Sequence, residues 1–242
     1  MSWVAHDLEP YALHKHFAWR LAIIPLILGS YAPDMLTKPF VYGVPFFGHE
    51  LKASDPEQFH RGWPGVGFTH SLAFGIVVAG LVYIVFHSKL WALAFLIGEF
   101  AHVLTDIGDS VGVMLFFPFS TYHVSLGAWA YAAEHGRLVD GAAYFSGLGG
   151  VVWEGFWIVL CLLGWRLLKR DYFHEHVATL DAFFRWTRGR VPEDVALAFY
   201  RTTYFWGVSR WFGWMIWAHV VNDYPIDLHW GGPAWVTQMP VP

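Results

Sequence analysis

The chain has 242 residues, of which 56% are hydrophobic and 14% are charged, and its formal net charge is −4. Soluble domains carry about 25% charged residues, so this composition excludes an ordinary water-soluble domain and predicts a membrane protein. The acidic balance offers no basic stripe for nucleic acid, and the single cysteine excludes a disulfide bond within the chain.

Five apolar runs recur along the chain, and each is predicted to form one transmembrane helix. With their flanking aromatic residues, the runs approach the roughly 20 residues that span a bilayer core. They cover residues 21–32, 72–86, 90–103, 151–168 and 196–221. The abundant tryptophan, tyrosine and phenylalanine fit aromatic belts at the two membrane interfaces. We therefore expect an all-α polytopic membrane helical bundle, with about five transmembrane helices, in a single domain over residues 1–242.

The segments between these runs suggest an orientation in the membrane. Residues 36–69 and 107–150 contain no apolar run long enough to cross a bilayer and are expected outside. Residues 171–194 carry apolar side chains at helical spacing, which predicts an amphipathic helix on the cytoplasmic surface. Lys and Arg are more numerous on the proposed cytoplasmic side, which indicates a cytoplasmic N-terminus in a bacterial inner membrane. Arg201 and Arg210, inside the last apolar run, are expected to meet Glu154 or lipid phosphate.

The sequence AHVLTD places chemically active side chains within an otherwise apolar run. His102 and Asp106 are four residues apart, so a helix stacks them on one face, as a shared metal ion requires. Glu99 lies one turn before His102 on the same face and is a further ligand or an orienting partner. Ionisable residues near a membrane are costly, which favours a functional pair here.

Polar clusters at three predicted helix ends fall on the same external side. Asp34 follows the first run, His70 precedes the second, and Asp106 follows the third. Together with His102 they form a set of two histidines and two carboxylates, which suits zinc or another first-row divalent ion. The alternative is that each residue caps a helix or is a satisfied polar group at the interface.

A second element, AHVVND over residues 218–223, repeats the pattern of AHVLTD. It places His219 and Asp223 on one helical face, and the two elements could flank a cavity that holds two metal ions. Chance similarity of six residues is the alternative.

Three segments in order, LILGSYAPD, FHRGWPGVGFTHSL and HVLTDIGDSVGVMLFFPF, resemble the LexA-regulated, membrane-bound metal-dependent hydrolase family, the YdjM-like proteins. The resemblance covers roughly residues 24–120, which divides the chain into a motif region, residues 1–120, and an unmatched helical extension, residues 121–242. It implies that the metal or active-site positions are Asp34, His60, Arg61, His70, His102 and Asp106. The family's N-terminal histidine would correspond to His16 or His14.

The chain departs from the family pattern at two places. Leu36 stands where the second aspartate of the family's PDID element is expected, and additional residues separate HRG from THS. One metal ligand of the family is therefore expected to be missing.

These observations lead to two hypotheses of different classes. The first is a membrane-embedded metal-dependent hydrolase that uses a divalent ion, expected to be zinc, to activate water against an ester or phosphoester, with a lipid-linked substrate as an option. Glu99 would orient the water or accept its proton, and Arg61 would hold an anionic group. The second is a non-catalytic accessory subunit whose aromatic surface packs against other membrane protein subunits. Both place the chain in contact with the lipid bilayer and neither involves nucleic acid.

Overall fold

The computed structural model describes residues 2–16, 20–62, 66–131, 135–230 and 235–238, and most of them are helical. The α-helices are α1 (Ala5–His16), α2 (Ile23–Met35), α3 (Lys38–Tyr42), α4 (Pro56–Arg61), α5 (Leu72–Phe86), α6 (Lys89–Asp106), α7 (Arg137–Ser146), α8 (Glu154–Leu163), α9 (Arg170–Tyr172), α10 (Ala182–Thr187) and α11 (Glu193–Ile216). Shorter helical turns of the 3-10 or π type are η1 (Gly67–His70), η2 (Gly149–Trp153), η3 (Trp165–Leu168), η4 (Phe173–Val177) and η5 (Trp217–Val221).

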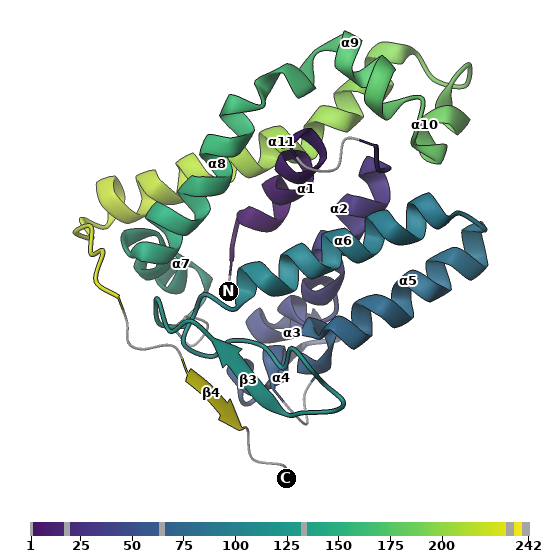
Figure 1. Ribbon diagram of the computed structural model, residues 1–242. Helices are drawn as coiled ribbons and strands as arrows, with labels where there is room; N and C mark the ends of the chain where they lie inside the picture. The colour runs from purple at the N-terminus through teal and green to yellow at the C-terminus, as the bar shows by residue number, and fades with distance from the viewer. Residues whose placement is uncertain (1, 17–19, 63–65, 132–134, 231–234, 239–242) are drawn as a thin grey trace.

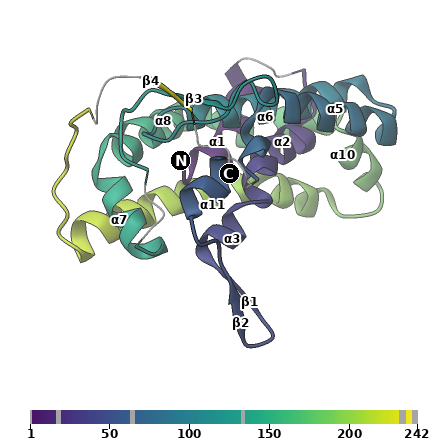
Figure 2. The same ribbon diagram turned by 90° about the horizontal axis from the view of Figure 1, so that it is seen from below.

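Two small antiparallel sheets accompany the helices. Strands β1 (Val44–Phe46) and β2 (His49–Leu51) form a hairpin that projects away from the helical body (Figure 2). Strands β3 (Tyr122–Ser125) and β4 (Trp235–Gln238) form the second sheet, which joins the middle of the chain to its C-terminal part.

Helix α1 lies at the centre of the molecule (Figure 1). It packs against α2 and α6 on one side and against α8 and α11 on the other. Helices α5 and α6 form an antiparallel pair, and serine caps define where each begins. Ser71 Oγ accepts the backbone N–H of Phe74 at 3.3 Å, and Ser88 Oγ accepts that of Trp91 at 3.3 Å. The capped pair places the last turn of α6 beside the end of α2.

Two glycines allow α2 and α6 to approach at backbone distance. A Cβ on Gly29 would lie 2.1 Å from the carbonyl oxygen of Phe95, and a Cβ on Gly98 would lie 2.1 Å from that of Leu26. Any side chain at either position would force the helices apart. This crossing brings the backbone of α2 within hydrogen-bonding reach of side chains on α6.

The prediction of a polytopic bundle with about five transmembrane helices is wrong. Every helix among the described residues falls short of a bilayer crossing, in length or in apolar character. The predicted runs are helical, but α2 and α5 have 13 and 15 residues, fewer than the roughly 20 that a crossing needs. The run at 151–168 is divided among η2, α8 and η3. The longer helices, α6 and α11, carry charged residues within their length.

The predicted amphipathic surface helix within residues 171–194 is also not formed as one element. Asp181 interrupts it, because its carboxylate accepts the backbone N–H groups of Phe183 and Ile24, each at 2.8 Å. The cap starts the separate helix α10. The apolar side chains of Val177 and Phe184 are nevertheless buried, as the spacing predicted.

The arginines of α11 do not pair with Glu154 as predicted. Arg210 donates to Asp7 Oδ2 at 2.6 Å, and Arg201 donates to the carbonyl oxygen of Leu168 at 2.9 Å. Glu154 instead accepts backbone N–H groups near the start of α1. The assignment of the N-terminus to the cytoplasmic side, which depended on the predicted spans, stays a prediction.

Candidate metal centre

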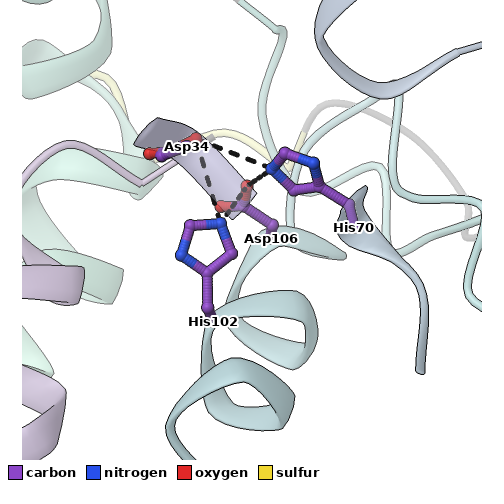
Figure 3. Close-up of side chains that lie close together, drawn as sticks. All are labelled: Asp34, His70, His102 and Asp106. Atoms are coloured by element: carbon purple, nitrogen blue, oxygen red, sulfur yellow. Dashed lines mark ion pairs between the residues drawn. The ribbon is translucent and has the colours of Figure 1, made fainter. Parts of the chain in front are cut away.

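Four buried side chains meet where α2, η1 and α6 end. Asp34 lies in the last turn of α2, His70 ends η1, and His102 and Asp106 occupy the last turn of α6. One nitrogen or oxygen atom from each lies within 4.8 Å of the others. Figure 3 shows the four side chains pointing toward one another, two of them from α6 and one each from α2 and η1. These are the residues that the order of the predicted helix ends was expected to bring together.

The distances among these atoms match ligands around one ion. His70 Nε2 lies 3.6 Å from Asp34 Oδ1 and 3.6 Å from Asp106 Oδ2. His102 Nε2 lies 3.9 Å and 3.7 Å from the same two oxygens. Ligands placed 2.0–2.2 Å from a zinc ion in a tetrahedron are about 3.3–3.6 Å apart. The observed separations are too long for good hydrogen bonds and only slightly longer than this spacing.

The imidazole of His102 is oriented by the backbone of α2. Its Nδ1 lies 2.6 Å from the carbonyl oxygen of Ser30, so Nδ1 carries the hydrogen that this acceptor requires. The lone pair of the neutral ring is then on Nε2, which faces the carboxylates. Metal-binding histidines are usually held by a hydrogen bond of this kind.

Two threonines orient His60 and His70 in the same way. Thr37 Oγ1 lies 2.7 Å from His60 Nδ1, and Thr69 Oγ1 lies 3.2 Å from His70 Nδ1. Each threonine hydroxyl donates its own hydrogen to the carbonyl oxygen of Pro33, so each accepts from its histidine. Both rings therefore also present the Nε2 lone pair.

The atoms that face the centre are buried and have no hydrogen-bond partner among the residues that the structure describes. They are Asp34 Oδ1 and the Nε2 atoms of His60, His70 and His102. Buried polar atoms are nearly always hydrogen-bonded, and each exception needs an explanation. A cation explains the atoms of Asp34, His70 and His102 at once, since these three offer lone pairs to the same space, which His60 borders. The donor set therefore fits a divalent metal ion.

Cations outside this set keep both carboxylates ionised. Burial by itself would raise the pKa of Asp34, but the adjacent Lys38 ammonium holds it well below its usual range. Burial would likewise raise the pKa of Asp106, and Arg61 holds it well below the usual range. Burial lowers the pKa of His70 and His102, which favours the neutral rings that metal coordination needs.

Arg61 is fully buried and holds the carboxylates of α6 and the following loop in place. Its guanidinium donates to Asp106 Oδ2 at 2.5 Å and to Asp109 Oδ2 at 2.6 Å. A further bond of 3.0 Å reaches the carbonyl oxygen of Asp106. The guanidinium of Arg61 thus already binds two carboxylates of the chain. Its predicted role in holding an anionic group of a substrate stays a prediction.

His6 on α1 is the residue at this centre that the sequence analysis missed. Its Nε2 lies 3.4 Å from Asp106 Oδ1, and its ring stacks on that of His102 with centroids 3.6 Å apart. Its Nδ1 lies 2.8 Å from Glu9 Oε1. Burial lowers the pKa of His6, but the carboxylates of Glu9 and Asp106 raise it to about 10. The available signal was the His-Glu pair three residues apart, together with the family's N-terminal histidine.

The remaining predicted site residues lie at different distances from the centre. His60 borders it, with Nε2 3.3 Å from Asp34 Oδ1. His16 is at the exposed end of α1, where its Nε2 lies 3.1 Å from the carbonyl oxygen of Leu160, and the structure does not bring it to the four-residue group. His14 is buried beside the Tyr172 hydroxyl at 2.9 Å. Neither occupies the place that His6 takes.

Glu99 is fully buried on α6, and neither of its carboxylate oxygens has a hydrogen-bond partner in the described part of the chain. The carboxylate fills the space where a Cβ on Gly75 of α5 would stand. Burial raises its pKa to about 9, so the group is protonated at neutral pH. It is therefore suited to donate a proton rather than to accept one, and its predicted catalytic role stays a prediction.

A model of the YdjM inner membrane protein family matches residues 5–173 of the chain. The match begins at α1 and therefore includes His6 as well as the four residues of the centre. No curated protein and no solved structure matches the chain.

Proposed function

Because the chain belongs to the YdjM inner membrane protein family, we propose that it is a metal-dependent hydrolase that cleaves an ester or phosphoester bond with an activated water. The observation that carries the proposal is the convergence of unpartnered, buried lone pairs on one space between α2, η1 and α6. A centre that served only to cap helices would pair these atoms with backbone groups.

The residues of the chain have separate roles in this proposal. Asp34, His70, His102 and Asp106 would hold the ion, with His6 and His60 at its two flanks. When bound, a divalent ion lowers the pKa of a coordinated water and polarises the oxygen of a substrate ester. Arg61 keeps Asp106 ionised and fixed, and the hydrogen bonds on Nδ1 hold each histidine with Nε2 toward the ion.

A cavity of about 470 Å³ reaches the centre, since His6 and Asp34 both contribute to its wall. A substrate can therefore approach the proposed ligand Asp34 and the flanking His6 without unfolding any element. We propose zinc as the ion, because a mixture of imidazole nitrogens and carboxylate oxygens at near-tetrahedral spacing suits it.

Metal analysis of the full chain purified in detergent tests the proposal. The wild-type chain should carry a stoichiometric divalent ion and hydrolyse a chromogenic ester or phosphoester such as p-nitrophenyl phosphate or acetate. Asp34→Asn and His70→Ala should lose the ion and the activity together. His174→Ala is the matched control, because His174 is an exposed histidine paired with Glu193 at 2.9 Å. Unchanged metal content in the two site variants would remove the proposed centre.

The same measurements separate the alternative function. A wild-type chain that binds no metal and hydrolyses none of these esters, but copurifies with a defined set of membrane proteins, would be an accessory subunit. Stoichiometric metal that disappears with Asp34→Asn would oppose that interpretation.

A further inference from the structure

The wall of the cavity that reaches the centre carries more cationic side chains than carboxylates. Lys38, Arg137 and Arg210 contribute to its wall, whereas the carboxylates in the wall are those of Asp7 and Asp34. The cations thus outnumber the carboxylates before any metal ion is bound. A bound divalent ion would make the excess of positive charge larger, which favours an anionic ligand.

Each of these cations retains hydrogen-bond donors beyond those already used. Lys38 has three N–H donors and contacts Asp34 and the carbonyl oxygen of Ser2, the latter at 3.2 Å. Arg210 has five and uses two, on Asp7 Oδ2 and on the carbonyl oxygen of Trp3. Arg137 is exposed and forms no ion pair with another described residue. The unused donors are those that phosphate oxygens accept.

An apolar groove continues from the cationic cavity. A second cavity of about 320 Å³ shares Arg137, Trp206 and Arg210 with the first, and its wall extends to Leu138, Trp214 and Trp217. It follows α11 and η5 from residue 206 to residue 217, which is roughly 16 Å at the rise of an α-helix. The edge of Trp214 meets Trp3 of the first cavity with ring centroids 5.1 Å apart, so aromatic side chains join the two spaces.

Arg137 and Leu138 of this wall lie within the part of the chain that the family model matches, whereas the residues that α11 and η5 contribute follow residue 173 and lie outside it. The two elements that meet at the groove are joined by a hydrogen bond, since Trp217 Nε1 of η5 donates to the carbonyl oxygen of Leu138 of α7 at 3.1 Å. The extension of the chain beyond the family match thus adds an apolar surface to the cationic cavity.

We propose that the cavity and the groove together bind an amphiphile with a terminal phosphate monoester. The phosphate lies among Lys38, Arg137 and Arg210 beside the centre, and the apolar chain follows the tryptophans of α11 and η5. This inference rests on the proposed function in one respect, because it places the phosphoester next to the proposed ion. It commits to a phosphorylated membrane lipid rather than to free phosphate.

Binding measured by calorimetry on the full chain in detergent tests the inference. The probes are dihexanoyl phosphatidic acid, dihexanoyl phosphatidylcholine and inorganic phosphate. Phosphatidic acid should bind at least about tenfold more tightly than either of the others, because only it supplies both a phosphate monoester and apolar chains. Equal affinity for inorganic phosphate or for phosphatidylcholine would overturn the proposal.

Two variants locate the binding site. Arg137→Gln should weaken the binding of phosphatidic acid about tenfold, and Arg137→Lys should restore most of it. Leu138→Ser should weaken it about threefold to tenfold and leave the weak binding of inorganic phosphate unchanged. Arg190→Gln is the matched control, because Arg190 is exposed and contributes to neither cavity. Unchanged affinity in both Arg137→Gln and Leu138→Ser would overturn the assignment.

Metal content measured on the same preparations keeps this inference apart from the proposed function. Arg137→Gln should retain the wild-type metal content, since Arg137 contacts none of the proposed ligands. If wild-type protein carries no metal and yet binds phosphatidic acid through Arg137 and Leu138, the inference about the ligand is supported and the hydrolase proposal fails. If wild-type protein carries metal but neither variant changes the affinity for phosphatidic acid, the inference about the ligand fails and the proposed metal centre stands.

Discussion

The sequences AHVLTD and AHVVND place a histidine and an aspartate four residues apart in two regions of the molecule. At the end of α6, His102 and Asp106 are fully buried, and His102 Nε2 faces carboxylates without a hydrogen-bond partner. At η5, both ring nitrogens of His219 face carbonyl oxygens, Nδ1 that of Tyr224 at 2.8 Å and Nε2 that of Phe145 at 3.2 Å. Asp223 is exposed there.

The difference between the two regions comes from the elements around them rather than from the sequences themselves. His102 and Asp106 receive Asp34 from α2, His70 from η1 and His6 from α1. His219 instead fastens η5 to the end of α7. A histidine and an aspartate one turn apart therefore become part of a candidate metal centre only where other chain segments bring further potential ligands.

Replacing the histidine of each region tests whether only the first region holds metal. His102→Ala should lower metal affinity more than about a hundredfold, because even changing the hydrogen-bond partner of a ligand costs roughly 10–100-fold. His219→Ala should keep the wild-type metal content and lose only the hydrogen bonds to Tyr224 and to Phe145 of α7. Metal analysis of the detergent-purified variants provides the measurement. Equal loss of metal in both variants would mean that the two regions contribute to one centre.

The buried guanidinium of Arg61, next to the first region, can be compared with the surface guanidinium of Arg170 by the stability that each contributes. Arg61→Met leaves Asp106 and Asp109 buried without their cation, which should lower the free energy of unfolding by about 3–5 kcal/mol. Arg170→Met is the matched control, since its pairs with Glu193 and Asp194 are on the surface and contribute about 0–1 kcal/mol. Unfolding by denaturant in detergent measures both, and similar losses in the two variants would contradict the buried role of Arg61.

The two regions also differ three residues before the histidine, where the first has Glu99 and the second has Ile216. Burial raises the pKa of Glu99 from 4.5 to about 9, so the folded state holds its proton more tightly than the unfolded state. The stability due to this proton is complete below pH 4.5 and is lost as the pH rises toward 9. Glu99→Gln should therefore unfold at a higher temperature than wild type at pH 8 and show a flatter dependence on pH.

Thermal unfolding of wild type and Glu99→Gln between pH 5 and pH 9 checks this expectation. Glu193→Gln is the control, since Glu193 is exposed and should leave the slope with pH unchanged. A wild-type slope that persists in Glu99→Gln would show that another group causes it.

The sequence predicted the parts of this molecule that depend on local pattern. Apolar runs located the helices α2, α5 and α6, and the polar residues at their ends identified Asp34, His70, His102 and Asp106. It did not predict His6, because no periodicity connects α1 to the end of α6. The contact depends on where α1 packs, between α2 and α6 on one side and α8 and α11 on the other.

The breaks within the apolar runs also escaped prediction from the sequence. Hydropathy alone does not distinguish one long helix from the succession of η2, α8 and η3 that residues 149–168 form. The interruption at Asp181 depends on a hydrogen bond to the backbone of Ile24, which is distant in the sequence. Both features are set by tertiary contacts rather than by local composition.

The smallest expected effect concerns the backbone of the second region. Asp106 belongs to α6, whereas Asp223 has φ of +52°, in the left-handed region that costs a residue with a Cβ about 1–2 kcal/mol. Asp223→Gly removes this cost but gains freedom in the unfolded chain, so the net stabilisation should not exceed about 1 kcal/mol. Asp223→Ala keeps a Cβ and should be less stable than Asp223→Gly, and neither substitution should change the metal content. Loss of metal from either variant would contradict the separation of the two regions, because Asp223 follows η5 and belongs to none of the residues grouped at the centre.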